Sequence, residues 1–96
     1  MASIDYVAKH IKDPDAVLDY PLGWKDWLVP GDTIVNATAT LAGGTAAIDQ
    51  VEHTNDVVTV WLSGGVVGQK CEITVHIVTD QGREDDRTIL VTVKQR

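Results

Sequence analysis

Apolar and polar residues alternate along most of this 96-residue chain, with the period of two that is typical of half-buried β-strands. The alternation is cleanest in residues 71–79 and 87–93, which are separated by a short acidic segment with a glycine. Because residues i and i+2 lie on the same face of a strand, one face of this pair collects the apolar side chains. The predicted core positions are Cys71, Ile73, Val75, Ile77, Ile89, Val91 and Val93.

Other segments predict further strands. Residues 57–62 place Val58, Val60 and Leu62 on one face, residues 46–52 form a weaker strand, and residues 16–20 begin the first strand.

Residues 33–41 also alternate, but they fit two frames. The better core face carries Val35, Ala37, Ala39 and Leu41, whereas Ile34 favours the opposite frame.

These strands recur at intervals of roughly ten residues, and glycine, asparagine and aspartate mark the connections. The pattern predicts an all-β fold, an antiparallel β-sandwich of about six or seven strands, formed by residues 13–96. Residues 1–12 have neither a strand nor a helix period, and they end near Pro14, which favours an extended or turn conformation at Asp13. We therefore expect residues 1–12 to be an N-terminal arm.

A tryptophan-containing segment lies between the first strand and residue 33. Trp24, Trp27 and Leu28 have the spacing i, i+3 and i+4, so a short helical turn at Trp24–Leu28 would place them on one side. Gly23 and Pro30 would confine this turn. Two interpretations remain open: the indoles close one end of the sandwich as part of the core, or they form an exposed ligand platform.

The composition supports strands and excludes some partners. Valine, isoleucine and threonine are frequent and phenylalanine is absent, which favours pleated surfaces over helices. The net charge is −6 with no basic cluster, so we expect no nucleic-acid partner. No apolar run is long enough to cross a membrane and no signal peptide is apparent, so we expect no membrane partner and synthesis in a cytoplasm.

The sequence contains no recognisable catalytic or metal-binding constellation. His10, His53 and His76 each occur without a second ligand at metal-site spacing, and surface positions are expected for them. Cys71 is the only cysteine and occupies a predicted core position. Residues 80–86 fit a hairpin turn better than a calcium loop. We therefore predict a protein that is not an enzyme and that has no cofactor or metal.

One apolar set lies on predicted outward faces and is a candidate partner interface. If Trp61, Val78 and Leu90 are neighbours, they form an exposed apolar patch. A shifted strand frame, or cover by the arm, would explain the same residues without an interface. The arm adds four further candidate interface residues, Ile4, Tyr6, Val7 and Ile11.

Several strings resemble a family of small structural proteins of tailed bacteriophages, sometimes labelled fiber–tail adaptor proteins. The most specific are "KDPDAVLDY", "W-x-x-WL", "DTI", "VWLSGG" and "GR-x-D-x-R"; the last comprises Gly82, Arg83, Asp85 and Arg87. The resemblance covers residues 12–96. It departs from the family at Cys71, where a tyrosine is expected, so any hydrogen bond of that tyrosine is missing here.

The resemblance implies an immunoglobulin-like sandwich that serves as a virion component, with no catalytic or cofactor-binding residues. It implies an adaptor that links tail or head–tail components to fibers, made in the host bacterial cytoplasm. Its partners would be other phage structural proteins, tail, connector or fiber, in a symmetric multi-copy assembly. The alternatives are a capsid decoration protein and a carbohydrate-binding module, the latter suggested only by the two neighbouring tryptophans.

Overall fold

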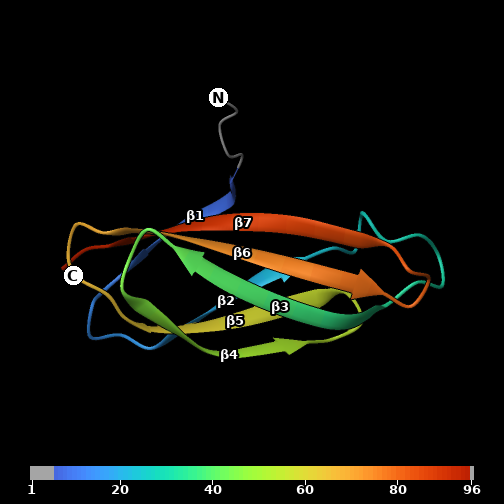
Figure 1. The fold of residues 1–96 in the computed structure, drawn as a ribbon, viewed down its shortest axis with the longest axis horizontal. Helices are drawn as coiled ribbons and strands as arrows, with labels where there is room; N and C mark the ends of the chain where they lie inside the picture. Colours follow the sequence, from blue (N-terminus) through green and yellow to red (C-terminus); the bar gives the residue numbers. More distant parts are fainter. Residues whose placement is uncertain (1–5, 96) are drawn as a thin grey trace.

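The structure, a computed structural model, describes residues 6–95 and consists of seven β-strands in two sheets (Figure 1). The strands are β1 (Tyr6–Lys12), β2 (Leu18–Gly23), β3 (Ile34–Ala42), β4 (Ala46–His53), β5 (Val57–Gly64), β6 (Lys70–Thr79) and β7 (Glu84–Val93). One sheet has the order β1-β7-β6-β3 and the other β2-β5-β4. All pairs are antiparallel except β1 and β7, which are parallel.

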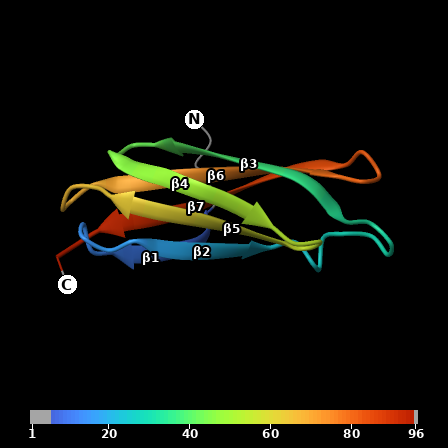
Figure 2. The same cartoon turned by 90° about the horizontal axis from the view of Figure 1, so that it is seen from below.

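The two sheets face each other and enclose one apolar core, and Figure 2 shows them as two layers. The central strands β5, β6 and β7 contribute most of it, because every second side chain on them points inward. The inward positions predicted on these three strands are confirmed, each being at most 1 % exposed: Val58, Val60, Leu62, Cys71, Ile73, Val75, Ile77, Ile89, Val91 and Val93.

A β-bulge explains why β3 fits two sequence frames. The pairing with β6 shifts between Ile34 and Asn36, so Val35 is the extra residue of the strand. Ile34 is 2 % exposed, whereas Val35 is 51 % exposed. The prediction that Val35 faces the core is therefore wrong, while Ala37, Ala39 and Leu41 pack against the core as expected.

Residues 6–12 were expected to lie in an arm without regular structure, and the structure corrects this prediction. They form β1, which pairs in parallel with β7 from Tyr6–Thr88 to Lys12–Val93. Alternation did not reveal this strand because its inward positions hold Ala8, His10 and Lys12, none of which is a large apolar residue. The first five residues of the predicted arm, Ile4 among them, lie outside the described part of the chain.

Lys12 is completely buried at the end of β1. Its Nζ donates hydrogen bonds to the carbonyl oxygens of Asp13 and Gly64, each at 2.8 Å. The Lys94 backbone N–H also donates to the Lys12 carbonyl at 2.9 Å. These bonds satisfy a polar group that burial alone would penalise, and they join three chain segments at this end of the sandwich.

The short helical turn predicted at Trp24–Leu28 is not present. The backbone N–H groups of Trp27 and Leu28 both donate to the Trp24 carbonyl, at 2.9 and 3.0 Å, and the chain then leaves the turn toward Pro30. One hydrogen-bonded turn is too short to continue as a helix before a proline. None of the described residues belongs to a helix with the length and apolar character needed to span a membrane.

Candidate functional site

Trp24 is the largest side chain in the core and is 0 % exposed. Its backbone N–H donates to the Asp56 carbonyl at 2.8 Å, which holds the residue directly after β2. The indole Nε1–H donates to Asp85 Oδ2 at 2.9 Å. This bond connects the tryptophan segment to the start of β7, where the "GR-x-D-x-R" motif runs from Gly82, before the strand, to Arg87 within it.

Arg87 completes the surroundings of Trp24. Its guanidinium carbon lies 4.9 Å from the Trp24 ring centroid, and its Nε lies 3.5 Å from Asp85 Oδ2. The guanidinium also donates to the Gly23 carbonyl. One carboxylate oxygen thus serves both the indole and the arginine, and the arginine in turn covers the ring face.

Trp27 forms a second tryptophan–arginine pair beside the first. The guanidinium carbon of Arg83 lies 3.9 Å from the Trp27 ring centroid, and its Nη1 donates to the Trp27 carbonyl at 3.2 Å. Trp27 is half-buried and packs against the core. The interpretation of the tryptophans as core is thus confirmed for Trp24, while Trp27 lies at its edge.

The turn between β6 and β7 holds Arg83 in place. Gly82 has a φ of 81°, a conformation that glycine adopts without steric cost. The Arg83 backbone N–H donates to Thr79 Oγ1 at 3.0 Å, and the Thr79 N–H donates to the Arg83 carbonyl at 2.8 Å. The predicted hairpin connection at residues 80–86 is confirmed, although β7 already begins at Glu84.

Asp32, in the "DTI" string, binds the same turn. It is 7 % exposed, and its Oδ1 accepts hydrogen bonds from the backbone N–H groups of Thr33 at 3.0 Å and Gln81 at 3.1 Å. The Asp80 N–H donates to the Thr33 carbonyl at 2.9 Å. We call the segment of residues 24–33 together with the turn of residues 79–83 and the motif residues Asp85 and Arg87 the tryptophan–arginine cap.

The cap closes one end of the sandwich, at the right of Figure 1. The Trp24 and Asp32 side chains at its base are buried, whereas its tip exposes Lys25, Asp26, Val29, Pro30 and Gly31 to solvent. A depression of about 380 Å³ lies beside the tip, between residues 25–33 and the β4–β5 turn at Asn55 and Asp56. A rigid base with an exposed tip is suited to contact another protein, because little ordering entropy is lost on binding.

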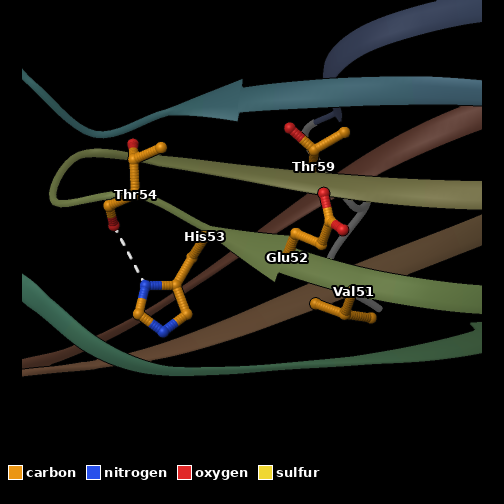
Figure 3. Close-up of a pocket in the computed structure, with 5 residues that line it drawn as sticks. All are labelled: Val51, Glu52, His53, Thr54 and Thr59. Atoms are coloured by element: carbon orange, nitrogen blue, oxygen red, sulfur yellow. Dashed lines mark hydrogen bonds between the residues drawn. The ribbon is translucent and has the colours of Figure 1, made fainter.

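A second depression, of about 480 Å³, lies near the end of β4 (Figure 3). Its lining residues are Val51, Glu52, His53, Thr54 and Thr59. His53 Nδ1 lies 3.0 Å from the Thr54 carbonyl oxygen, and the Glu52 carboxylate accepts a hydrogen bond from the Gln50 amide. In this depression the His53 ring contacts a backbone carbonyl, and the Thr54 hydroxyl oxygen accepts hydrogen bonds from the backbone N–H groups of Asp56 and Val57.

The three histidines have different surroundings. His53 is exposed, as expected. His10 is not at the surface: it is half-buried on the inner face of β1, and its ring centroid lies 4.7 Å from that of Tyr20. Within residues 6–95 no group of three or more histidine, cysteine, aspartate or glutamate side chains is placed to hold a metal ion.

His76 lies on the outer face of β6 between two carboxylates of β7. Its Nδ1 is 2.6 Å from Asp86 Oδ1 and its Nε2 is 2.7 Å from Glu84 Oε1. The hydrogen bond to Asp86, and next the one to Glu84, raise the pKa of His76 above its usual 6.5. The alternation in β6 predicted the outward position, but the two acidic partners come from the register with β7.

The outward apolar residues do not form one patch. Trp61 lies on β5, in the three-stranded sheet, whereas Val78 and Leu90 belong to the four-stranded sheet. In that sheet Val78 pairs with Glu84 and Leu90 pairs with Glu72, so the two lie near opposite ends of the β6–β7 ladder. The outward orientation was predicted correctly, but the three residues are not neighbours.

The candidate interface residues of β1 differ in exposure. Val7 is 54 % exposed and Ile11 is 46 % exposed. Tyr6 is half-buried, and its hydroxyl donates to Glu72 Oε1 at 2.6 Å, a bond that raises the pKa of the phenol. Val7 and Ile11 therefore remain available for contact, while Tyr6 is engaged within the sheet.

Sequence reasoning from the residues alone missed the cap. It singled out the two tryptophans, yet it gave no reason to join them to Arg83, Asp85 and Arg87, because the pairs are 56 and 61 positions apart. The signal that could have found them was the co-occurrence of the two motifs in the resemblance.

Comparison with known proteins gives one family. The family described as podophage GP4 fiber-tail adaptor protein gp77 matches residues 12–92. This range extends from Lys12 at the end of β1 almost to the end of β7 and includes the whole cap. Among curated proteins, no match is found.

Proposed function

Because the chain belongs to the podophage fiber-tail adaptor family, we propose that it is a non-enzymatic structural protein of the virion that links tail or head–tail components to fibers. The observation that carries this proposal is the family match over residues 12–92. The proposal includes an immunoglobulin-like sandwich fold. Two facing sheets with seven strands support this part of the proposal.

The adaptor would bind through surfaces at its ends and edges. The tip of the cap offers a mixed charged and apolar surface on a base that Trp24–Asp85 and Trp27–Arg83 hold in place. At the opposite end, two loops of residues 13–17 and 65–69 carry exposed apolar side chains: Val17 is 59 % exposed and Val66 is 58 % exposed. Two separate contact ends are what a linking protein requires.

The sides of the sandwich supply further candidate contacts. Val7 and Ile11 are exposed on β1, and Trp61 lies half-buried on the outer face of the three-stranded sheet. The partners are other phage structural proteins of the tail, connector or fiber, and several copies act together in a symmetric assembly, where repetition multiplies weak contacts. In this proposal the protein is made in the host bacterial cytoplasm and incorporated into the virion.

The decisive experiment removes the protein from the particle. A phage carrying a nonsense mutation in this gene, grown on a non-suppressing host, should give particles whose tails lack fibers, as seen by electron microscopy. Quantitative mass spectrometry of wild-type virions should find the chain in a few copies relative to the major capsid protein. Copies in step with the major capsid protein would instead indicate capsid decoration, and absence from the particle would exclude a virion role.

A further inference from the structure

The two sheets have four edge strands, and three of them carry features that block pairing with another strand. An exposed edge presents unpaired backbone N–H and C=O groups, and proteins protect such edges with charges, prolines or bulges. β2 has Asp19 and Pro21, and β1 has exposed Lys9 and a register shift near Val7.

The third protected edge is β4. Its pairing with β5 shifts between Ile48 and Gln50, and the strand exposes Asp49 and Glu52. The charges and the irregularity make this edge a poor template for a further strand.

The remaining edge, β3, has none of these protections over most of its length. Its sequence, "IVNATATLA", contains no charged residue, no proline and no glycine. The bulge at Val35 affects only the start, because residues 36–42 pair regularly with β6. Among the described strands β6 is the only one that pairs with β3, so the other side of β3 has no ladder partner.

We infer that β3 is an association surface, and that its occupant is β3 of a second copy of this chain, paired antiparallel. In the antiparallel register centred on Thr38, the outward residues pair as Thr38 with Thr38 and Asn36 with Thr40, and threonine pairs across antiparallel strands are stabilising. On the inner face, alanines meet alanines without a clash, and no like charges are opposed, as they would be in a β1–β1 pair at Lys9 or a β4–β4 pair at Glu52. The two four-stranded sheets would form one continuous sheet.

The net charge opposes this association and predicts how the association should depend on salt. Each copy carries a formal charge of −6, so two copies repel each other at low ionic strength. Since β3 itself is uncharged, added salt should screen the repulsion without weakening the contact. The inference goes beyond the proposed adaptor role, and purified protein tests it without reference to the virion, so either can fail alone.

Sedimentation velocity over a concentration series tests the inference. We expect a reversible monomer–dimer equilibrium that shifts toward the dimer as sodium chloride is raised. Thr38→Lys and Thr40→Lys place a charge on the edge and should weaken the dimer by roughly tenfold or more. The matched control, Thr59→Lys, puts the same charge on the outer face of β5, a central strand, and should leave the equilibrium unchanged.

Amide exchange of the wild-type protein locates the contact without any substitution. Within residues 36–40, the backbone N–H groups that point away from β6 should exchange more slowly as protein concentration rises, because the others already donate within the β3–β6 ladder. The amides of β1 and β4 should not change. A chain that stays monomeric at every concentration and salt would overturn the inference, and so would a dimer whose β3 amides gain no protection. Circular dichroism of each variant confirms that a lost dimer does not reflect an unfolded chain.

Discussion

The indole N–H of Trp24 and the carboxylate of Asp85 form a hydrogen bond of 2.9 Å between residues 61 positions apart. The Trp24 side chain is fully buried, and the same Asp85 oxygen, Oδ2, also lies 3.5 Å from Arg87 Nε. A segment without regular secondary structure is thereby fixed to the β6–β7 hairpin.

Removing the Asp85 carboxylate should destabilise the fold. Asp85→Ala leaves the Trp24 N–H without its acceptor and Arg87 without its anion, and we expect a loss of about 1.5–3 kcal/mol in the free energy of unfolding. Asp85→Asn keeps an acceptor and should cost less. Urea denaturation measures both, with Asp26→Ala, an exposed carboxylate on the cap tip, as the control. Equal stability of Asp85→Ala and Asp26→Ala would contradict the anchoring role.

The Trp27–Arg83 pair should contribute less, since both residues are only partly buried. A double-mutant cycle of Trp27→Leu and Arg83→Lys should give a coupling of about 0.5–1 kcal/mol, because lysine loses the planar stacking on the ring. Additive effects of the two substitutions would show that the contact of the guanidinium with the ring, at 3.9 Å, does not contribute to the free energy of unfolding.

Replacing the buried Lys12 by methionine should lower stability although methionine is more apolar. The substitution leaves the carbonyl oxygens of Asp13 and Gly64 without their Nζ donor, which should cost about 1–3 kcal/mol. The control is Lys9→Met on the same strand, where the side chain is exposed and a change near zero is expected. Thermal unfolding of the two variants measures both changes in stability. A Lys12→Met protein that is more stable than the wild type would contradict the expectation.

His76 should make stability depend on pH. Its pKa is raised in the folded state, so the imidazolium form stabilises the fold. This contribution is fully present below the ordinary value of 6.5 and disappears as pH rises through the raised folded pKa. The stability difference between wild type and His76→Gln should shrink over that interval. An NMR titration should also show a larger fall of the His76 pKa in Asp86→Asn than in Glu84→Gln; unchanged values in both would contradict the bridging geometry.

A side chain at Gly44 should destabilise the fold while Cys71 is present. A Cβ at Gly44 would lie 2.3 Å from Cys71 Sγ, which is completely buried. We expect Gly44→Ala to cost about 1–3 kcal/mol, and Cys71→Ala to relieve part of that loss in the double variant. Gly23→Ala, where a Cβ meets nothing within 4 Å, is the matched control. Denaturant midpoints of the wild type and of these four variants provide the comparison.

The strands with large inward side chains could be predicted from sequence, and the others could not. β6 and β7 were predicted from alternation alone because isoleucine, valine and one cysteine occupy the inward positions of residues 71–77 and 89–93. β1 was not predicted because its inward residues include a lysine, whose ammonium group donates to the carbonyl oxygens of the next residue, Asp13, and of the distant Gly64. Local pattern carries no information about such distant partners.

The candidate site was even harder to predict from the sequence than these strands. Alternation assigned Trp61, Val78 and Leu90 to outward faces, and it could not assign them to sheets, since the face of a strand does not determine its neighbours. The bulge at Val35 likewise became apparent only from the pairing of β3 with β6. In the cap, each tryptophan contacts an arginine that is distant in the sequence, and the residue spacing within each motif does not predict these contacts.

The parallel pairing of β1 with β7 has a mechanical consequence. These are the first and last strands of the described chain, and six residue pairs join them side by side. Because the strands run in the same direction, a pull applied between the two chain ends acts along both strands in opposite senses. All the hydrogen bonds of this ladder would then share the load in shear and would break together rather than one after another, so the geometry resists tension between the two chain ends.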